Sequence, residues 1–154
     1  MLAQLLTPPT AFSYAGSRLA IWLASVVVLL KMAIALGAIF NGHYAASVAD
    51  GIPLETYTLA GAQAVLGLFG SLGFSQLLLG LVGVLVIARN RALLPAYLVL
   101  LLVENLGRKL LALALPIPRV GGTGGVLVTW AMAGLLLLAL VLSLRPSAPS
   151  NRAS

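Results

Sequence analysis

Long runs of apolar residues, separated by short polar or proline-rich stretches, dominate the hydrophobic pattern of this chain. Four such runs lie near residues 19–40, 59–88, 92–115 and 126–144. At about 1.5 Å of rise per residue, a helix over each run is long enough to cross a hydrocarbon core of roughly 30 Å. The pattern therefore predicts an all-α integral membrane protein, built as an up-down bundle of four transmembrane helices.

The stretches between these runs are short, and they contain the turn-forming residues. Residues 41–57 contain no Lys or Arg, residues 89–91 read Arg-Asn-Arg, and prolines and glycines fill 116–125. Short connections favour antiparallel neighbours in a bundle. We therefore expect a cytoplasmic or interfacial segment at 1–18, one transmembrane domain at 19–144 and a disordered cytoplasmic tail at 145–154.

Composition supports a membrane protein and excludes most soluble classes. Hydrophobic residues make up 61% of the chain and charged residues 8%, which is too little polar material to cover a water-soluble globule. The net charge of +6 does not indicate nucleic acid as a partner, because the basic residues are scattered between apolar runs. We instead expect them to mark membrane flanks and to contact membrane lipids.

The distribution of basic residues predicts the orientation. Those on one side of the four runs are Arg18, Arg89, Arg91, Arg145 and Arg152. On the other side, Arg119 is accompanied by Asp50 and Glu55. The positive-inside rule then places both termini in the cytoplasm. We expect these two carboxylates to lie in an outer loop, exposed to water.

Metal and redox chemistry are disfavoured by what the chain lacks. It has no cysteine and one histidine, His43, so thiolate metal sites, iron–sulfur ligation and a haem held by two histidines are excluded. We therefore expect no metal and no cofactor. The aromatic residues Trp22, Trp130, Tyr57 and Tyr97 fit interfacial or lipid-facing positions better than a cofactor pocket.

Three polar residues lie at one depth in the predicted bundle. Lys31, Gln76 and Glu104 are each 13 residues from the arginine at the cytoplasmic end of their own helix, which is about 20 Å into the membrane. An ionised side chain at this depth costs from a few to more than ten kcal/mol unless it finds a partner. A contact between Lys31 and Glu104, across the first and third helices, is the least costly arrangement.

The third helix carries further polarity around Glu104. Arg108 follows one turn later on the same face, and Asn105 and Lys109 form a second stripe. Counting Lys31, Arg108 and Lys109 against Glu104 leaves about two positive charges to be neutralised. The candidates are a bound anion or lipid headgroup, a partner's carboxylate, deprotonation of a lysine, or the two outer-loop carboxylates.

Small residues surround the polar positions of the first two helices. In the second helix Gly73, Gly80 and Gly83 flank Gln76 at spacings of three and four, and alanines surround Lys31 in the first. Such faces allow close helix packing, which indicates that both polar side chains point inward. The fourth helix contributes almost no polar residue, so we expect the site between the first three helices, with the fourth as its cover.

These residues support one leading hypothesis and three alternatives. The leading one is a non-enzymatic membrane protein that binds an amphipathic ligand, such as a lipid, isoprenoid or quinone, or that joins partner chains in a homo-oligomer or larger complex. The candidate ligand-binding residues are Lys31, Gln76, Glu104, Asn105 and Arg108. The first alternative is a small membrane enzyme that uses Glu104 as acid or base on a lipid. The others are a structural accessory subunit of a larger complex, and a polar network that only fixes helix packing.

One sequence resemblance bears on location. The run Leu102-Val103-Glu104-Asn105-Leu106-Gly107-Arg108-Lys109, following Arg89-Asn90-Arg91, resembles segments of small bacterial membrane proteins with four spans. It covers about one and a half helices and implies no particular activity. The resemblance implies a bacterial inner-membrane location.

Overall fold

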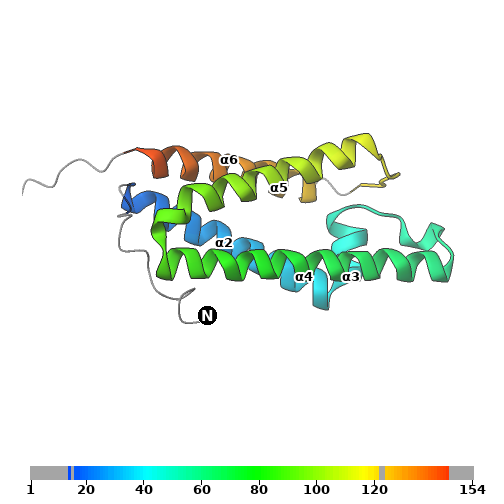
Figure 1. The fold of residues 1–154 in the computed structure, drawn as a ribbon. Helices are drawn as coiled ribbons and strands as arrows, with labels where there is room; N and C mark the ends of the chain where they lie inside the picture. The colour runs from blue at the N-terminus through cyan, green and yellow to red at the C-terminus, as the bar shows by residue number, and fades with distance from the viewer. Residues whose placement is uncertain (1–13, 15, 122–123, 146–154) are drawn as a thin grey trace, which may run out of the picture.

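The computed structural model describes residues 14, 16–121 and 124–145, and its regular structure there is entirely helical (Figure 1). The four long helices are α2 (Arg18–Phe40), α4 (Leu59–Arg89), α5 (Leu94–Ala114) and α6 (Gly124–Leu144). Each begins and ends within about two residues of the range predicted from the sequence. The expectations for most of the segment 1–18 and for the tail beyond residue 145 lie outside the described residues.

Short helical elements fill the connections. The link from α2 to α4 contains α3 (Gly42–Tyr44), the π-helix η1 (Ala45–Ala49) and the 3-10 helix η2 (Leu54–Thr56). The link from α4 to α5 is the 3-10 helix η3 (Arg91–Leu93). The first link folds back beside the long helices instead of extending away from them (Figure 1).

Local sequence explains where the long helices begin. The side-chain hydroxyl of Ser17 accepts a hydrogen bond from the Ala20 N–H at 3.2 Å, and Thr58 caps α4 in the same way. These contacts satisfy backbone donors that a helix N-terminus leaves unpaired. A proline in the first turn of α5 removes a donor that would have no helical partner there.

Among the described residues, three helices are long and apolar enough to cross a membrane: α2, α4 and α6. α5 has the same length as α6, 21 residues, but it carries Glu104, Arg108 and Lys109. Its composition alone therefore does not identify it as a membrane span.

The packing order of the helices differs from their order in the sequence. α2 packs extensively against both α4 and α6, and α6 in turn packs against α5. α4 and α5 contact each other mainly toward η3 and then diverge (Figure 1). α6 therefore packs against both α2 and α5, and the prediction that the fourth helix covers a site formed by the first three stays a prediction.

Glycines set the close approach of α2 and α4. A Cβ added at Gly73 would lie 2.8 Å from the backbone oxygen of Ala35 and 3.1 Å from the Ala38 Cβ, and Gly80 and Gly83 are equally confined. All three glycines are buried, as is Gln76 between them. The small-residue face predicted for this helix therefore packs within the chain.

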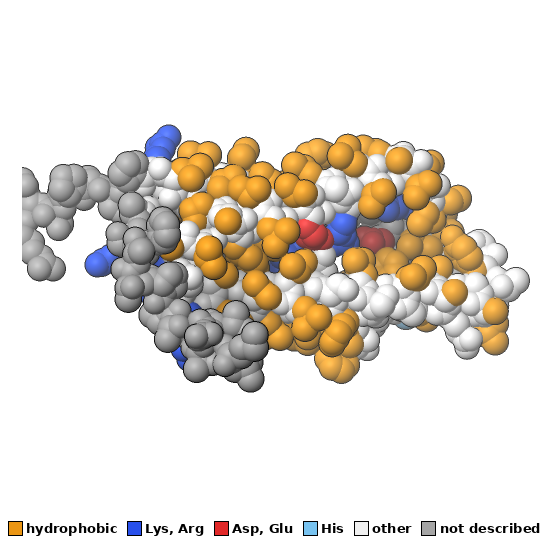
Figure 2. Space-filling model, in the orientation of Figure 1, with side chains coloured by type: hydrophobic (Ala, Val, Ile, Leu, Met, Phe, Trp, Pro, Cys, Tyr) orange, Lys and Arg blue, Asp and Glu red, His pale blue; other side chains and the backbone are white. Residues whose placement is uncertain are grey.

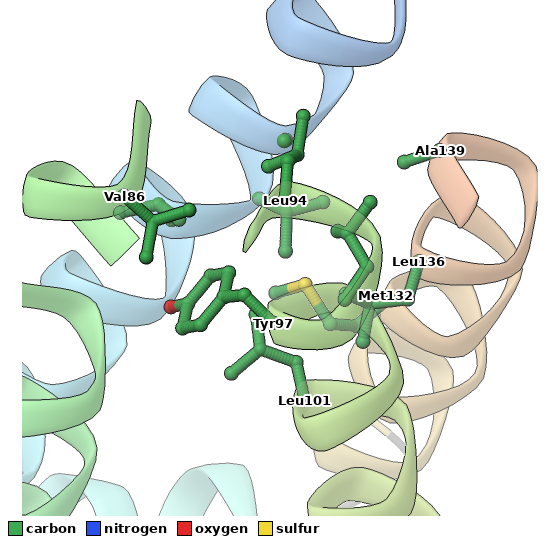
Figure 3. Packing of buried hydrophobic residues seen from close by; sticks show 11 residues of the cluster. Val86, Leu94, Tyr97, Leu101, Met132, Leu136 and Ala139 are labelled. Atoms are coloured by element: carbon green, nitrogen blue, oxygen red, sulfur yellow. The ribbon is translucent and has the colours of Figure 1, made fainter. Parts of the chain in front are cut away.

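The main hydrophobic core fills the end of the bundle near η3. It brings together residues of all four long helices, among them Leu94, Leu101 and Leu136 (Figure 3). Tyr97 is 4% exposed, and its hydroxyl donates to the Leu79 carbonyl at 2.9 Å. The prediction of an interfacial Tyr97 is wrong, because the hydroxyl finds an acceptor inside the bundle.

The opposite half of the bundle is more open. All buried residues of α5 precede Glu104, and all buried residues of α6 lie at Met132 or later. A second, smaller core at this end joins Ala46, Ile52 and Leu54 to α4. The four helices are therefore tightly packed at one end, and they splay apart at the other beneath the folded-back link.

Candidate functional site

A buried ion pair lies where the packed half of the bundle meets the open half. The Lys31 Nζ is 2.7 Å from the Glu104 Oε2, and the two side chains are 6% and 17% exposed. The Gln76 amide donates to the other carboxylate oxygen of Glu104. The predicted contact between the first and third helices is confirmed, and the second helix contributes to the same cluster.

The next turn of α5 extends this cluster toward the open half. The Arg108 guanidinium is 3.5 Å from the Glu104 Oε1, but its side chain remains 49% exposed. The Asn105 Oδ1 is buried and has no hydrogen-bond partner. Lys31 is therefore committed to Glu104, whereas Arg108 and Asn105 retain hydrogen-bonding capacity for another molecule.

A cavity of about 490 Å³ lies directly beyond these side chains. Its polar lining includes Lys31, Gln76, Asn105, Arg108 and Asp50. Its remaining walls are largely apolar and come from α2, α4, α6 and the folded-back link, and they include Ile34, Ala38, Val48, Leu72, Val128 and Met132. Polarity concentrated at one part of an otherwise apolar cavity suits a molecule with a polar head and an apolar body.

A second cavity, of about 110 Å³, adjoins the first and is mainly polar. Arg108, Lys109 and Arg119 line it together with Asp50. The two cavities share several walls, including Asp50, Asn105 and Arg108. Acidic and basic side chains indeed form a row between apolar surfaces on the face seen in Figure 2.

The α2–α4 link and the α5–α6 link meet beside the smaller cavity. The Val120 N–H donates to the Gly51 carbonyl at 2.8 Å, which ties the α5–α6 link to the α2–α4 link. A Cβ at Gly125 would lie 2.9 Å from the Ala49 backbone oxygen and 2.5 Å from the Asp50 Oδ1, so the start of α6 favours glycine there. Asp50 is thus held close to the N-terminal end of α6.

The two acidic residues of the α2–α4 link lie in different environments. Glu55 is exposed, as expected for a solvated loop residue. Asp50 is partly buried and lines both cavities, so it lies near the basic side chains as one of the predicted neutralising groups. Within the described residues Asp50 has no cation within 4.0 Å, so it faces the basic side chains without forming a direct ion pair.

Two basic residues of the smaller cavity were not among the predicted binding residues. The Lys109 Nζ lies 5.7 Å from the centre of the Trp130 ring, a cation–π distance, while Trp130 remains exposed as predicted. Arg119 is exposed in the α5–α6 link and still lines the cavity. Arg119 contributed only to the predicted orientation, as the lone basic residue among the outer flanks.

Metal ligation finds no support in the part of the chain that the structure describes. No group of three or more His, Asp or Glu side chains there could hold an ion. Comparisons of the chain with protein-family models, curated proteins and solved structures found no match. Functional inference therefore starts from the geometry of the cavities.

Proposed function

We propose that this protein crosses the membrane four times and binds an amphipathic ligand in the larger cavity, which is lined by residues of α2, α4, α5 and α6. The ligand's polar head contacts Asn105 and Arg108, and its apolar body lies against Ile34, Leu72 and Val128. The protein acts as a binding protein and not as an enzyme. The observation that carries the proposal is the buried, unpaired Asn105 oxygen at the polar end of an apolar cavity.

The fourth crossing in this proposal is α5. Its 21 residues span about 31 Å, which is long enough to cross a bilayer. Because the η3 link from α4 is short, α5 runs back alongside the bundle. Its ionisable residues have contacts within the chain: Glu104 pairs with Lys31, Arg108 lies 3.5 Å from the same carboxylate, and Lys109 lies over the Trp130 ring. Such pairing is how transmembrane helices accommodate charge. Both termini then lie on one side, which the basic flanks mark as cytoplasmic.

The ion pair shapes how the head would be held. The Lys31 ammonium pairs with Glu104 and so holds the carboxylate in place. The carboxylate in turn orients Arg108. The half-exposed Arg108 guanidinium is the donor best placed for ligand oxygens, and arginine offers them a planar fork of N–H groups. Gln76 and Glu104 therefore position the binding groups, and Arg108 and Asn105 supply the direct contacts.

The two leading alternatives receive less support from the site. An acid–base role for Glu104 needs a free carboxylate, yet Lys31, Gln76 and Arg108 engage both of its oxygens. An accessory subunit would present its small-residue face to a partner, whereas Gly73, Gly80 and Gly83 of α4 are buried within the chain.

Native mass spectrometry of the protein extracted in a mild detergent tests the proposal. The wild-type protein should retain lipid-sized molecules, and Arg108→Gln should reduce the retained fraction by roughly tenfold, since a hydrogen bond to a charged group contributes about 1.5–3 kcal/mol. The matched control is Arg89→Gln, which removes an exposed arginine that lines neither cavity.

Circular dichroism keeps the result interpretable by showing whether each variant retains its helices. Loss of bound molecules in a helical Arg108→Gln protein, with retention in Arg89→Gln, supports the proposal. Equal retention in wild type, Arg108→Gln and Glu104→Gln refutes binding at this site. A wild-type protein that carries no lipid-sized molecule under any mild extraction refutes it as well.

A further inference from the structure

The smaller cavity carries more positive charge than the chain neutralises. Three basic side chains line it, Arg108, Lys109 and Arg119, against the single carboxylate of Asp50. Glu104 does not remove the excess, because its own partner Lys31 balances it. Two positive charges therefore remain, in a niche whose neighbouring surfaces are apolar.

The N-terminal end of α6 adds to this positive potential. Gly125 and Thr129 of its first two turns line the cavity, and α6 is a helix of 21 residues. A helix N-terminus carries the positive end of the helix dipole and favours negative charge nearby. The Asp50 carboxylate lies beside Gly125, so the chain itself already places one negative charge near this helix end.

Arrangement of the two cavities restricts the ligand further. The basic niche is small, and it adjoins the larger, mostly apolar cavity through shared walls at Asn105 and Arg108. An anion that is compact, carries up to two charges and is attached to an apolar chain matches both volumes. A phosphate monoester has this charge at neutral pH, and its oxygens suit arginine forks and lysine ammonium groups.

We infer that the ligand's polar head is a phosphate group, held by Arg108, Lys109 and Arg119 in the niche beneath the outer links, with its apolar chain in the larger cavity. This inference rests on the proposed function, whose amphipathic ligand it makes specific. Asp50 weakens phosphate binding, because its carboxylate lowers the net positive charge of the niche. The Asn105 amide contacts the ligand where head and chain join, since rotation about its last bond presents either its oxygen or its NH₂ group.

Lipid exchange followed by native mass spectrometry separates the phosphate from the chain. Purified protein is incubated with dioleoyl phosphatidic acid, with dioleoylglycerol, which has the same chains and no phosphate, or with inorganic phosphate alone. We expect phosphatidic acid to be retained at least tenfold more than dioleoylglycerol. Inorganic phosphate at millimolar concentration should not displace it if the lipid is the source of the phosphate, and should displace it if the site accepts free phosphate.

Substitutions in the niche assign the effect to its charges. Arg119→Gln should lower phosphatidic acid retention about tenfold and leave dioleoylglycerol retention unchanged. The control is Arg145→Gln, an exposed arginine at the opposite end of α6. Asp50→Asn should raise phosphatidic acid retention several-fold, while Glu55→Gln, an exposed carboxylate of the same link, should not.

The outcomes distinguish this inference from the proposed function. Equal retention of phosphatidic acid and dioleoylglycerol, both lost in Arg108→Gln, overturns the phosphate head but leaves an amphipathic ligand in place. Retention of neither lipid overturns both. A preference for phosphatidic acid that survives Arg119→Gln and Lys109→Gln in helical proteins overturns the niche as the phosphate site.

Discussion

The ion pair between Lys31 and Glu104 should respond asymmetrically to removal of its two members. Glu104 keeps Gln76 and Arg108 as partners when Lys31 is replaced, whereas Lys31 has no other ion-pair partner among the described residues. Glu104→Gln thus leaves the ammonium of Lys31, a residue only 5% exposed, without a counter-charge, while Lys31→Met leaves a carboxylate that is still partly neutralised.

The magnitudes follow from burial. Leaving one member of a buried pair uncompensated costs about 3–5 kcal/mol, so we expect Glu104→Gln to lower the free energy of unfolding by this amount. Lys31→Met should cost about half as much. The double variant removes both charges and should recover most of the loss, because replacing a buried pair by neutral groups is often close to neutral.

Unfolding in mixed micelles, with increasing dodecyl sulfate and far-ultraviolet circular dichroism as the readout, measures these free energies. Glu55→Gln serves as the control, since it removes an exposed carboxylate that forms no ion pair with any described residue and should change stability by less than about 0.5 kcal/mol. The reasoning is refuted if Lys31→Met costs as much as Glu104→Gln, or if the double variant loses the sum of the two single losses.

Two further predictions concern packing and topology. Gly73→Ala should destabilise the protein by about 1–3 kcal/mol in the same unfolding assay, because its new methyl group meets backbone, whereas Gly70→Ala has open space and should be neutral or slightly stabilising. Because the chain has no cysteine, single cysteines report topology cleanly: a membrane-impermeant maleimide should label Glu55→Cys and Val120→Cys from one side of the membrane and Asn90→Cys from the other. Labelling of Val120→Cys on the side of Asn90→Cys would show that α5 does not cross.

Sequence periodicity was sufficient for the helices and for the ion pair. Apolar runs define helix length directly, and counting residues from the flanking arginines placed Lys31, Gln76 and Glu104 at one depth. Burial in an apolar environment left these groups few alternatives to pairing with each other. That constraint made a contact between distant segments predictable.

The packing order and the basic niche could not be predicted in the same way. Which helices α6 packs against depends on side-chain packing among apolar faces that look alike in the sequence. The position of Asp50 depends on how the π-helix η1 folds back and on the close approach that Gly125 permits. The residue type of Tyr97 likewise favours an interfacial position. Its burial depends on a hydrogen-bond acceptor in another helix, a backbone carbonyl, which the sequence does not reveal.

The central claim is that the cavity beside Asn105 and Arg108 holds an amphipathic ligand. A crystal structure of the protein grown in a lipid phase, after mild extraction, tests it most directly. We predict elongated density with its polar end within hydrogen-bond distance of Asn105 and Arg108, and with its chain against Ile34 and Leu72. A structure in which α5 closes onto α4, with the Asn105 oxygen paired inside the chain and no density between the helices, would contradict it.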